Sequence, residues 1–287
     1  MPIFSIILPT YDRAKLLARA VQSVVEQSFK DWELIVIDDG SSDNTKDVIA
    51  KFEDNRIKYF YQKNKGRSIS RNNGIIHSDG DWICFLDSDD CYISTHLEVF
   101  NICIQSDPKS TVYKTGVQFI NEKGNVIFKS LYKSANDNAL KFFSTNYCSI
   151  LDLCISKNVA KNSKFENVST WEDKAYILDL LKNNNIYQIH KRTVTALEHN
   201  ERSVLKVHEN PTEINTVLQL MSNKLTEHNA SNYLISFVQQ NFLLSVLIDA
   251  QKLQYSSKSI KSLVMQLYIK PTWQTSLKLL KARVFNT

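Results

Sequence analysis

The chain has 287 residues, of which 43% are hydrophobic, and its formal net charge is +5. This length and apolar content supply ample material for a buried core, which excludes a disordered or collagen-like chain. Seven bases and no acid lie in residues 251–287, so residues 1–250 carry a net charge of −2. Nucleic-acid binding, which needs a continuous cationic track on the folded body, is therefore not expected.

The five cysteines are odd in number and show no Cys-x-x-Cys spacing. They indicate core residues in a reducing compartment, not a disulfide framework or a zinc site. The apolar run before Pro9 is only about six residues long, too short for a signal peptide. The uncharged run 229–248 is broken by Ser, Asn and Gln, so no membrane span is expected there. These features favour a cytoplasmic protein.

Short apolar runs rich in β-branched residues alternate with helix-period segments over the first ninety residues. The expected strands are 3–8, 33–37, 57–61 and 82–86. The expected helices are 14–27, 44–52 with Ser41 or Ser42 as its N-cap, and 68–77. This order predicts an α/β domain with a mostly parallel sheet, helices on both faces, and ligands at the carboxyl ends of the strands.

The pattern is mixed after residue 93. It predicts a helix over 94–106, two strands on either side of the turn 121–124, and a helix over 172–182. Beyond residue 203 the chain is expected to be helical, with breaks at Pro211 and Pro271. Because strand-like runs stop near residue 205, we expect an α/β domain over 1–205 and a helical extension over 206–287.

Each of the first four expected strands is followed by a polar cluster. These clusters are Pro9-Thr10-Tyr11-Asp12-Arg13, Asp38-Asp39-Gly40-Ser41-Ser42, Asn64-Lys65-Gly66-Arg67 and Asp87-Ser88-Asp89-Asp90. The carboxyl ends of parallel strands meet at one edge of a sheet. We therefore expect carboxylates, cations and an aromatic ring to line one cleft there.

The run Asp87-Ser88-Asp89-Asp90 places three carboxylates within four residues. Their repulsion is costly unless a cation or hydrogen-bond donors compensate it, and oxygen ligands at this density suit Mg²⁺ or Mn²⁺. An acidic turn that caps the next helix is the alternative. On the residues alone, both interpretations stay open.

The cluster over residues 38–42 is also explained by Asx turns and helix capping without any ligand. At a strand end, however, its carboxylates would accept from a base N–H or a ribose hydroxyl, and Tyr11 would stack on that base. Neither a Gly-x-Gly-x-x-Gly motif nor a P-loop is present. The negative charge of a diphosphate would then be compensated by a metal, by Arg71 or Arg67, and by the N–H groups near Gly66.

In combination these residues resemble glycosyltransferase family 2, and the resemblance is dense over residues 1–92. The matching residues are Ser5-Ile6-Ile7-Leu8-Pro9-Thr10-Tyr11, Gln22-Ser23-Val24, Gln27-Ser28-Phe29, Trp32 to Asp43, Asn64, Gly66, Ser70-Arg71-Asn72 and Phe85 to Asp90. The resemblance implies a GT-A fold with a Rossmann-like sheet, a nucleotide-diphosphate sugar donor, most often a UDP-sugar, and Mn²⁺ or Mg²⁺.

The same resemblance implies a role for each matching site residue. By this resemblance, Pro9, Thr10 and Tyr11 line the nucleobase site, and Asp39 accepts from the base ring N–H. Gly66 and Arg71 lie by the diphosphate, and Asp87 and Ser88 reach the ribose and sugar. Asp89 binds the metal, with Asp87 and His199 as the other metal residues. For His199, a surface histidine before a helix is the alternative.

The family's catalytic base is the Asp of a Glu-Asp pair that opens a later helix, and Glu172-Asp173 matches that pair. Asp173 is the base by this resemblance. The alternative is structural, because Thr170 and Asp173 approximate a capping box and acids are favoured in a first helical turn. The family's usual Gly-Phe-Asp is replaced by residues 163–166, so the acceptor side departs from the pattern.

The resemblance predicts an inverting enzyme that moves one sugar to a hydroxyl of a saccharide or lipid-linked saccharide in surface-glycan synthesis. A nucleotidyltransferase of similar architecture and a non-catalytic sugar-nucleotide-binding protein are the alternatives. The basic segment 251–287 has apolar residues beside its lysines, which is typical either of a peripheral contact with anionic lipid or of a helical cap packed on the catalytic domain.

Overall fold

The computed structural model describes residues 1–130, 149–168, 171–184, 186–199, 211–227 and 229. The chain divides into two compact units, Met1–His199 and Asn200–Thr287. The expected boundary near residue 205, the expected break at Pro271 and the basic segment 251–287 lie outside the described residues, so they stay predictions.

The first unit is built on one nine-stranded sheet of order β3-β2-β1-β4-β8-β6-β9-β5, with β7 paired to β6. The strands are β1 (Phe4–Thr10), β2 (Trp32–Asp38), β3 (Ile57–Tyr61), β4 (Trp82–Phe85), β5 (Cys91–Tyr92), β6 (Val112–Ile120), β7 (Val126–Lys129), β8 (Leu153–Ser156) and β9 (Ile186–Leu197). The first four strands of this order are parallel, as predicted. Beyond β4 the sheet is mixed, because β8 runs antiparallel to both β4 and β6.

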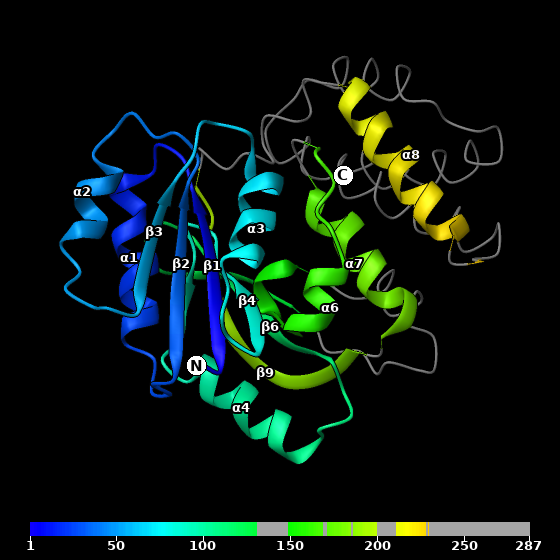
Figure 1. Cartoon of the computed structure of the whole chain (residues 1–287), viewed down its shortest axis with the longest axis horizontal. Coiled ribbons are helices and arrows are strands. Elements are labelled where there is room, and N and C mark those ends of the chain that lie inside the picture. Colours follow the sequence, from blue (N-terminus) through cyan, green and yellow to red (C-terminus); the bar gives the residue numbers. More distant parts are fainter. Residues whose placement is uncertain (131–148, 169–170, 185, 200–210, 228, 230–287) are drawn as a thin grey trace. The chain divides into compact units, whose positions relative to one another are not determined.

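Helices cover both faces of the parallel strands, with α1 and α2 on one side of β3-β2-β1 and α3 on the other (Figure 1). The helices of this unit are α1 (Ala14–Val25), α2 (Thr45–Ala50), α3 (Arg67–Ile76), α4 (His96–Ser106), α6 (Lys157–Asn162) and α7 (Glu172–Asn183), with a 3₁₀ turn η1 at Ile150–Asp152. Right-handed crossovers explain why α3 covers the opposite face from α1 and α2. The chain moves toward the β3 edge of the sheet as it passes from β1 to β2 to β3, and then returns in the opposite direction to β4. The fold is the expected α/β architecture.

The core of this unit lies around β1 and β2, in which every residue is buried. Their uninterrupted apolar runs fit strands that are covered on both faces. α3 packs closely on β1 at Gly74, where an added Cβ would lie 2.3 Å from Ile7 Cγ2. Only glycine fits at that position.

The predicted N-cap of the second helix is wrong. α2 begins at Thr45, and Asn44 stands at its N-cap without a side-chain cap bond. Asp43 Oδ1 accepts from the Thr45 N–H at 3.0 Å. Ser41 Oγ instead accepts from the Asp12 N–H at 2.9 Å. The serines therefore belong to the strand-end loop and not to the helix.

In the second unit, α8 (Pro211–Glu227) is the helix that the structure describes. No helix within the described ranges combines the length and apolar character that crossing a bilayer requires. The cysteines at 84, 91, 103 and 154 are free thiols, and Cys84 and Cys154 are buried in the core. Cys148 lies outside the described residues.

Candidate active site

The loops after β1 and β2 join at one edge of the sheet, as their strand order predicts. The Asp39 N–H donates to the Thr10 carbonyl at 2.9 Å, and the Gln62 N–H donates to the Asp38 carbonyl at the same distance. Pro9 and Thr10 form the last residues of β1, and Thr10 is buried. The ring of Tyr11, the next residue, is 49% exposed and is therefore available for stacking.

Asp39 organises the loop that leads into α3. Its Oδ1 accepts from Gln62 Nε2 at 2.7 Å and from the Lys65 N–H at 2.9 Å, and its Oδ2 accepts from the Gly66 N–H at 2.8 Å. Gly66 has a φ of +89°, which favours glycine. A carboxylate has about four acceptor positions. Since three are used by described residues, the hydrogen bonds among those residues leave one acceptor position of Asp39.

Asp12 was not expected to have a role, yet it fixes the first two loops together. Its φ is +48°, and its Oδ1 accepts from the Ser42 N–H at 2.7 Å and from the Asp43 N–H at 3.3 Å. The tolerance of Asp for left-handed backbone was the only signal in the sequence. The partners are about thirty residues away along the chain, so local patterns do not reveal the contact.

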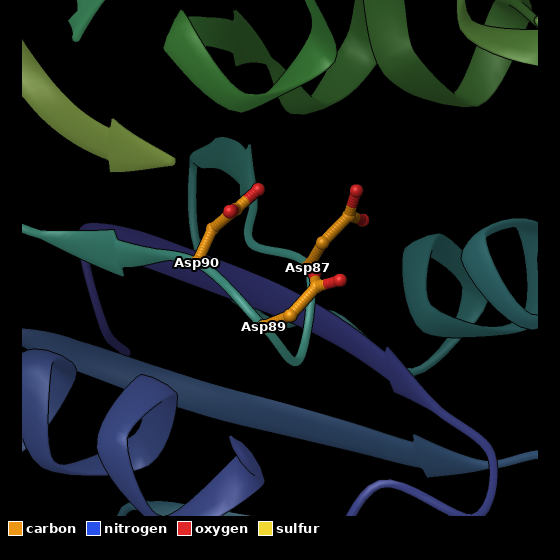
Figure 2. A group of neighbouring side chains, drawn as sticks. All are labelled: Asp87, Asp89 and Asp90. Atoms are coloured by element: carbon orange, nitrogen blue, oxygen red, sulfur yellow. The ribbon is translucent and has the colours of Figure 1, made fainter. Parts of the chain in front are cut away.

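Three carboxylates gather in the turn after β4. Asp87, Asp89 and Asp90 each offer an oxygen within 4.8 Å of the others (Figure 2). Asp90 is fully buried and its Oδ1 accepts from the Leu197 N–H at 2.9 Å. Ser88 is buried between them in sequence. Asp90 was part of the recognised motif but was not predicted as a ligand.

His199 meets this cluster from the end of β9. Its Nε2 lies 2.9 Å from Asp89 Oδ2, although 110 residues separate the two in sequence. The contact arises because β9 runs parallel to β6, and the Glu198 N–H then donates to the Ile120 carbonyl at 2.8 Å. The structure therefore places His199 against Asp89, whereas the three residues whose ligand atoms all lie within 4.8 Å of one another are Asp87, Asp89 and Asp90. The donor set of carboxylate oxygens and an imidazole fits Mn²⁺, and the oxygens alone fit Mg²⁺.

Arg71 lies between the carboxylate cluster and the start of α7. Its guanidinium donates to Glu172 Oε1 through Nη1 and to Asp87 Oδ1 through Nη2, the latter at 2.7 Å. Its side chain is only 2% exposed. Arg67 Nε also lies 3.6 Å from Glu172 Oε1, with a side chain that is 32% exposed. Arg71, which was predicted to lie by the diphosphate, is thus already paired with two carboxylates, and Arg67 is the more accessible of the two arginines.

The pKa values of Glu172 and Asp173 are shifted in opposite directions. Burial favours the neutral form of Glu172, but Arg67 and Arg71 outweigh it and hold the pKa of Glu172 below its usual range. Burial raises the pKa of Asp173, the charges of Glu172 and Asp87 add to that rise, and Lys174 opposes it. Asp173 is 20% exposed, with Lys174 Nζ 3.8 Å from its Oδ2. An accessible carboxylate with a raised pKa has the properties of a general base.

Trp171, with a φ of +51°, precedes the helix that carries this pair. α7 begins at Glu172, with both acids in its first turn. Thr170, the proposed partner in a capping box, lies outside the described residues.

Comparison with known proteins gives a family match over half of the chain. The model named Glycosyl transferase family 2 matches residues 5–152. The chain is 32% identical over 199 residues to the GalNAc(5)-diNAcBac-PP-undecaprenol beta-1,3-glucosyltransferase of Campylobacter jejuni, a match that covers 67% of this chain and 63% of that protein. It is 40% identical over 98 residues to WfgD of Escherichia coli, a UDP-Glc:alpha-D-GlcNAc-diphosphoundecaprenol beta-1,3-glucosyltransferase, over 34% of this chain and 39% of that protein. The chain thus spans less than two thirds of either relative.

Solved structures share the fold at lower identity. Residues 1–349 of S. aureus TarS, in complex with UDP-GlcNAc, align with a TM-score of 0.69 at 20% identity, over 99% of this chain and 80% of that one. The mannosyltransferase PcManGT from Pyrobaculum calidifontis, in complex with GDP-Man and Mn²⁺, aligns with a TM-score of 0.59 at 14% identity, over 99% and 85% of the two chains.

Proposed function

Because the chain belongs to glycosyl transferase family 2, we propose that it is an inverting glycosyltransferase that moves one sugar from a UDP-sugar to a hydroxyl acceptor. The observation that carries this proposal is the link through Arg71 between the carboxylate cluster at Asp87 and the helix that bears Asp173. That link supports the proposal because it joins Asp87 of the carboxylate cluster to Glu172, the residue before the candidate base.

Three groups at this edge suit the nucleotide part of the donor. The exposed ring of Tyr11, beside Pro9 and Thr10, offers a stacking surface for the base. The unused acceptor position of Asp39 suits a ring N–H. We expect the Ser88 hydroxyl and the Asp87 carboxylate to bond to sugar hydroxyls, with Asp87 as the acceptor. A UDP donor is further supported by WfgD, whose name includes UDP-Glc, and by the TarS complex with UDP-GlcNAc.

Asp87, Asp89 and His199 would hold a divalent cation, Mn²⁺ or Mg²⁺. When bound, that ion supplies positive charge to the diphosphate that leaves. Asp90 lies within the same group of oxygens and fixes the turn through the Leu197 N–H. Arg67, at the first residue of α3 and partly exposed, adds a second cation on the same side as Gly66.

Asp173 performs the proton transfer. Its carboxylate takes the proton of the acceptor hydroxyl while that oxygen forms a bond to the anomeric carbon and the bond from that carbon to the donor phosphate oxygen breaks. One displacement inverts the anomeric configuration. A base with a raised pKa is better matched to this task than an ordinary aspartate.

The acceptor we propose is a lipid-linked saccharide in surface-glycan synthesis, because the named relatives act on undecaprenol-linked sugars. An acceptor of that kind places the enzyme at a membrane surface, on the cytoplasmic side. Contact through the basic segment 251–287 is consistent with its seven bases and no acid.

The experiment that tests the proposal is incubation with UDP-glucose or UDP-GlcNAc, a lipid-linked GlcNAc-diphosphate acceptor and Mn²⁺, with NMR of the product. We expect UDP release and a β-linked product from the α-configured donor. In a parallel reaction with UTP and a sugar 1-phosphate, release of pyrophosphate would instead support a nucleotidyltransferase. A failure to turn over any UDP-sugar in a donor panel, with binding retained, would support a non-catalytic sugar-nucleotide-binding protein.

A further inference from the structure

The pair Glu172-Asp173 contains two acids with opposite surroundings. Glu172 is 2% exposed, and its Oε1 faces two guanidinium groups, those of Arg71 and Arg67. Its Oε2 is buried and accepts no hydrogen bond from the described residues. A carboxylate held in this way cannot reach an acceptor hydroxyl. Glu172 therefore needs a role other than that of a base.

Arg71 divides its guanidinium between two carboxylates instead of gripping one of them. Nη1 donates to Glu172 and Nη2 donates to Asp87, so each acid uses one oxygen on this arginine. Bidentate binding to a single carboxylate is the common alternative for arginine. Because Glu172 accepts from one arm of the guanidinium, Arg71 contacts Asp87 through Oδ1 alone, while Asp87 offers an oxygen to the cluster with Asp89 and Asp90.

Glu172 also fixes the rotation of α7. Consecutive residues on an α-helix project about 100° apart. When Glu172 points at Arg71 on α3, the direction of Asp173 is set as well. The contact is thus able to place the base relative to the carboxylate cluster, because α7, α3 and the turn after β4 meet at one guanidinium.

We propose that Glu172 is a positioning residue that acts through Arg71: it keeps an oxygen of Asp87 available to a cation and sets the direction of Asp173. This inference rests on the proposed function for its effect on turnover. Its effect on the carboxylate cluster does not depend on which sugar is transferred.

The test compares E172Q, R71K and the double variant in the full-length chain, with E33Q as the matched control. The control removes a buried carboxylate on β2 that bonds to Ser5 on β1, to Lys58 on β3 and to the Gly80 N–H in the loop before β4, outside the candidate site. Thermal unfolding establishes that each variant is folded at the assay temperature. The readouts are kcat and KM for the UDP-sugar and the affinity for Mn²⁺ alone, measured by electron paramagnetic resonance.

Two results support the proposal. E172Q should lower kcat on the order of 10²-fold, the cost of a misplacement of about 1 Å. R71K should cost less in the E172Q background than in the wild type, since both variants weaken the contact between Arg71 and Glu172. E172Q should also weaken Mn²⁺ binding several-fold, because Arg71 can then take both oxygens of Asp87, whereas E33Q leaves kcat and Mn²⁺ affinity unchanged.

Two results overturn it: an E172Q enzyme with kcat within twofold of wild type, or losses in E172Q and R71K that multiply in the double variant. If the wild-type chain transfers no sugar, the proposed function fails, and Mn²⁺ alone decides the positioning role. In that case equal Mn²⁺ affinity in wild type and E172Q overturns it, and weaker binding in E172Q but not in E33Q supports it.

Discussion

Asp173 owes its basicity to its surroundings, and pH should reveal this. Burial, with the charges of Glu172 and Asp87, raises its pKa, and Lys174 opposes that rise. A general base acts only when ionised, so kcat/KM should fall as the pH drops through this raised pKa, at a higher pH than for an ordinary aspartate. A profile of kcat/KM against pH measures the position of this acid limb.

Lys174→Ala provides the matching control for that profile. Loss of the ammonium removes the charge that lowers the pKa of Asp173, so the acid limb should move to higher pH. A limb that stays in place, or that moves to lower pH, would contradict the assignment of the limb to Asp173.

Glu33 illustrates a carboxylate whose role is stability. Although burial favours its neutral form, hydrogen bonds from Lys58, Ser5 and the Asp79 N–H hold the pKa of Glu33 below its usual range. Its contribution to stability is therefore present above the unfolded-state pKa of about 4.3 and is lost as the pH falls through the lower folded-state pKa. E33Q should lower the free energy of unfolding by about 2 kcal/mol at pH 7.

Urea denaturation of wild type and E33Q at several pH values checks this. The difference between the two should shrink as the pH is lowered below about 4. A difference that is constant between pH 7 and pH 3 would show that the charge of Glu33 is not responsible.

At the level of elements, the sequence best predicted the strands and turns whose positions are specified by neighbouring residues in the chain. Residues 57–61 were predicted as a strand and form β3, and the other three early strands differ by one or two residues at their ends. Their apolar runs are long enough to specify buried parallel strands. The hairpin of β6 and β7 was likewise signalled by its turn residues.

Elements set by distant partners were not predictable. β5 has two residues and exists through its pairing with β9. β8 is a short strand that lies between β4 and β6, and no local pattern specifies that position. The same reason applies to the site: the motif run and His199 were recognised by resemblance, but the link from Arg71 to Glu172 joins residues 101 apart in the sequence.

The packing of α3 on β1 predicts that Gly74→Ala is destabilising. The new Cβ would lie 2.3 Å from Ile7 Cγ2, in a fully buried strand. Overpacking of this kind costs about 1–3 kcal/mol, and the better helix propensity of Ala offsets about 1 kcal/mol of it. We expect a net loss of stability and a lower melting temperature.

Ile76→Ala is the control on the same helix, because Ile76 is 70% exposed. Its free energy of unfolding should change by about 0.5 kcal/mol or less. A G74A protein as stable as wild type would mean that α3 does not pack as closely on β1 as described.

At the scale of the whole molecule, charge is divided along the chain, and this predicts lipid binding. With a charge of +7 over residues 251–287 and −2 over the rest, we expect attraction to anionic lipid to come from the C-terminal segment. Each base near an anionic surface contributes about 1 kcal/mol. The full chain should cosediment with phosphatidylglycerol vesicles at low salt and less at high salt.

A variant with the seven bases of this segment changed to Gln is the comparison. It should remain in the supernatant with anionic vesicles, and neither protein should cosediment with neutral phosphatidylcholine vesicles. Equal sedimentation of the two proteins would show that the seven bases are not responsible for binding to the vesicles.

The central claim is that Asp173 takes the proton in a single displacement of the nucleotide diphosphate. Asp173→Asn keeps the size of the side chain and removes its ability to act as a base. The turnover of this variant, measured as UDP released from a UDP-sugar in the presence of acceptor and Mn²⁺, should fall by about 10²- to 10⁴-fold, with donor affinity nearly unchanged. Turnover equal to that of the wild type would contradict the account.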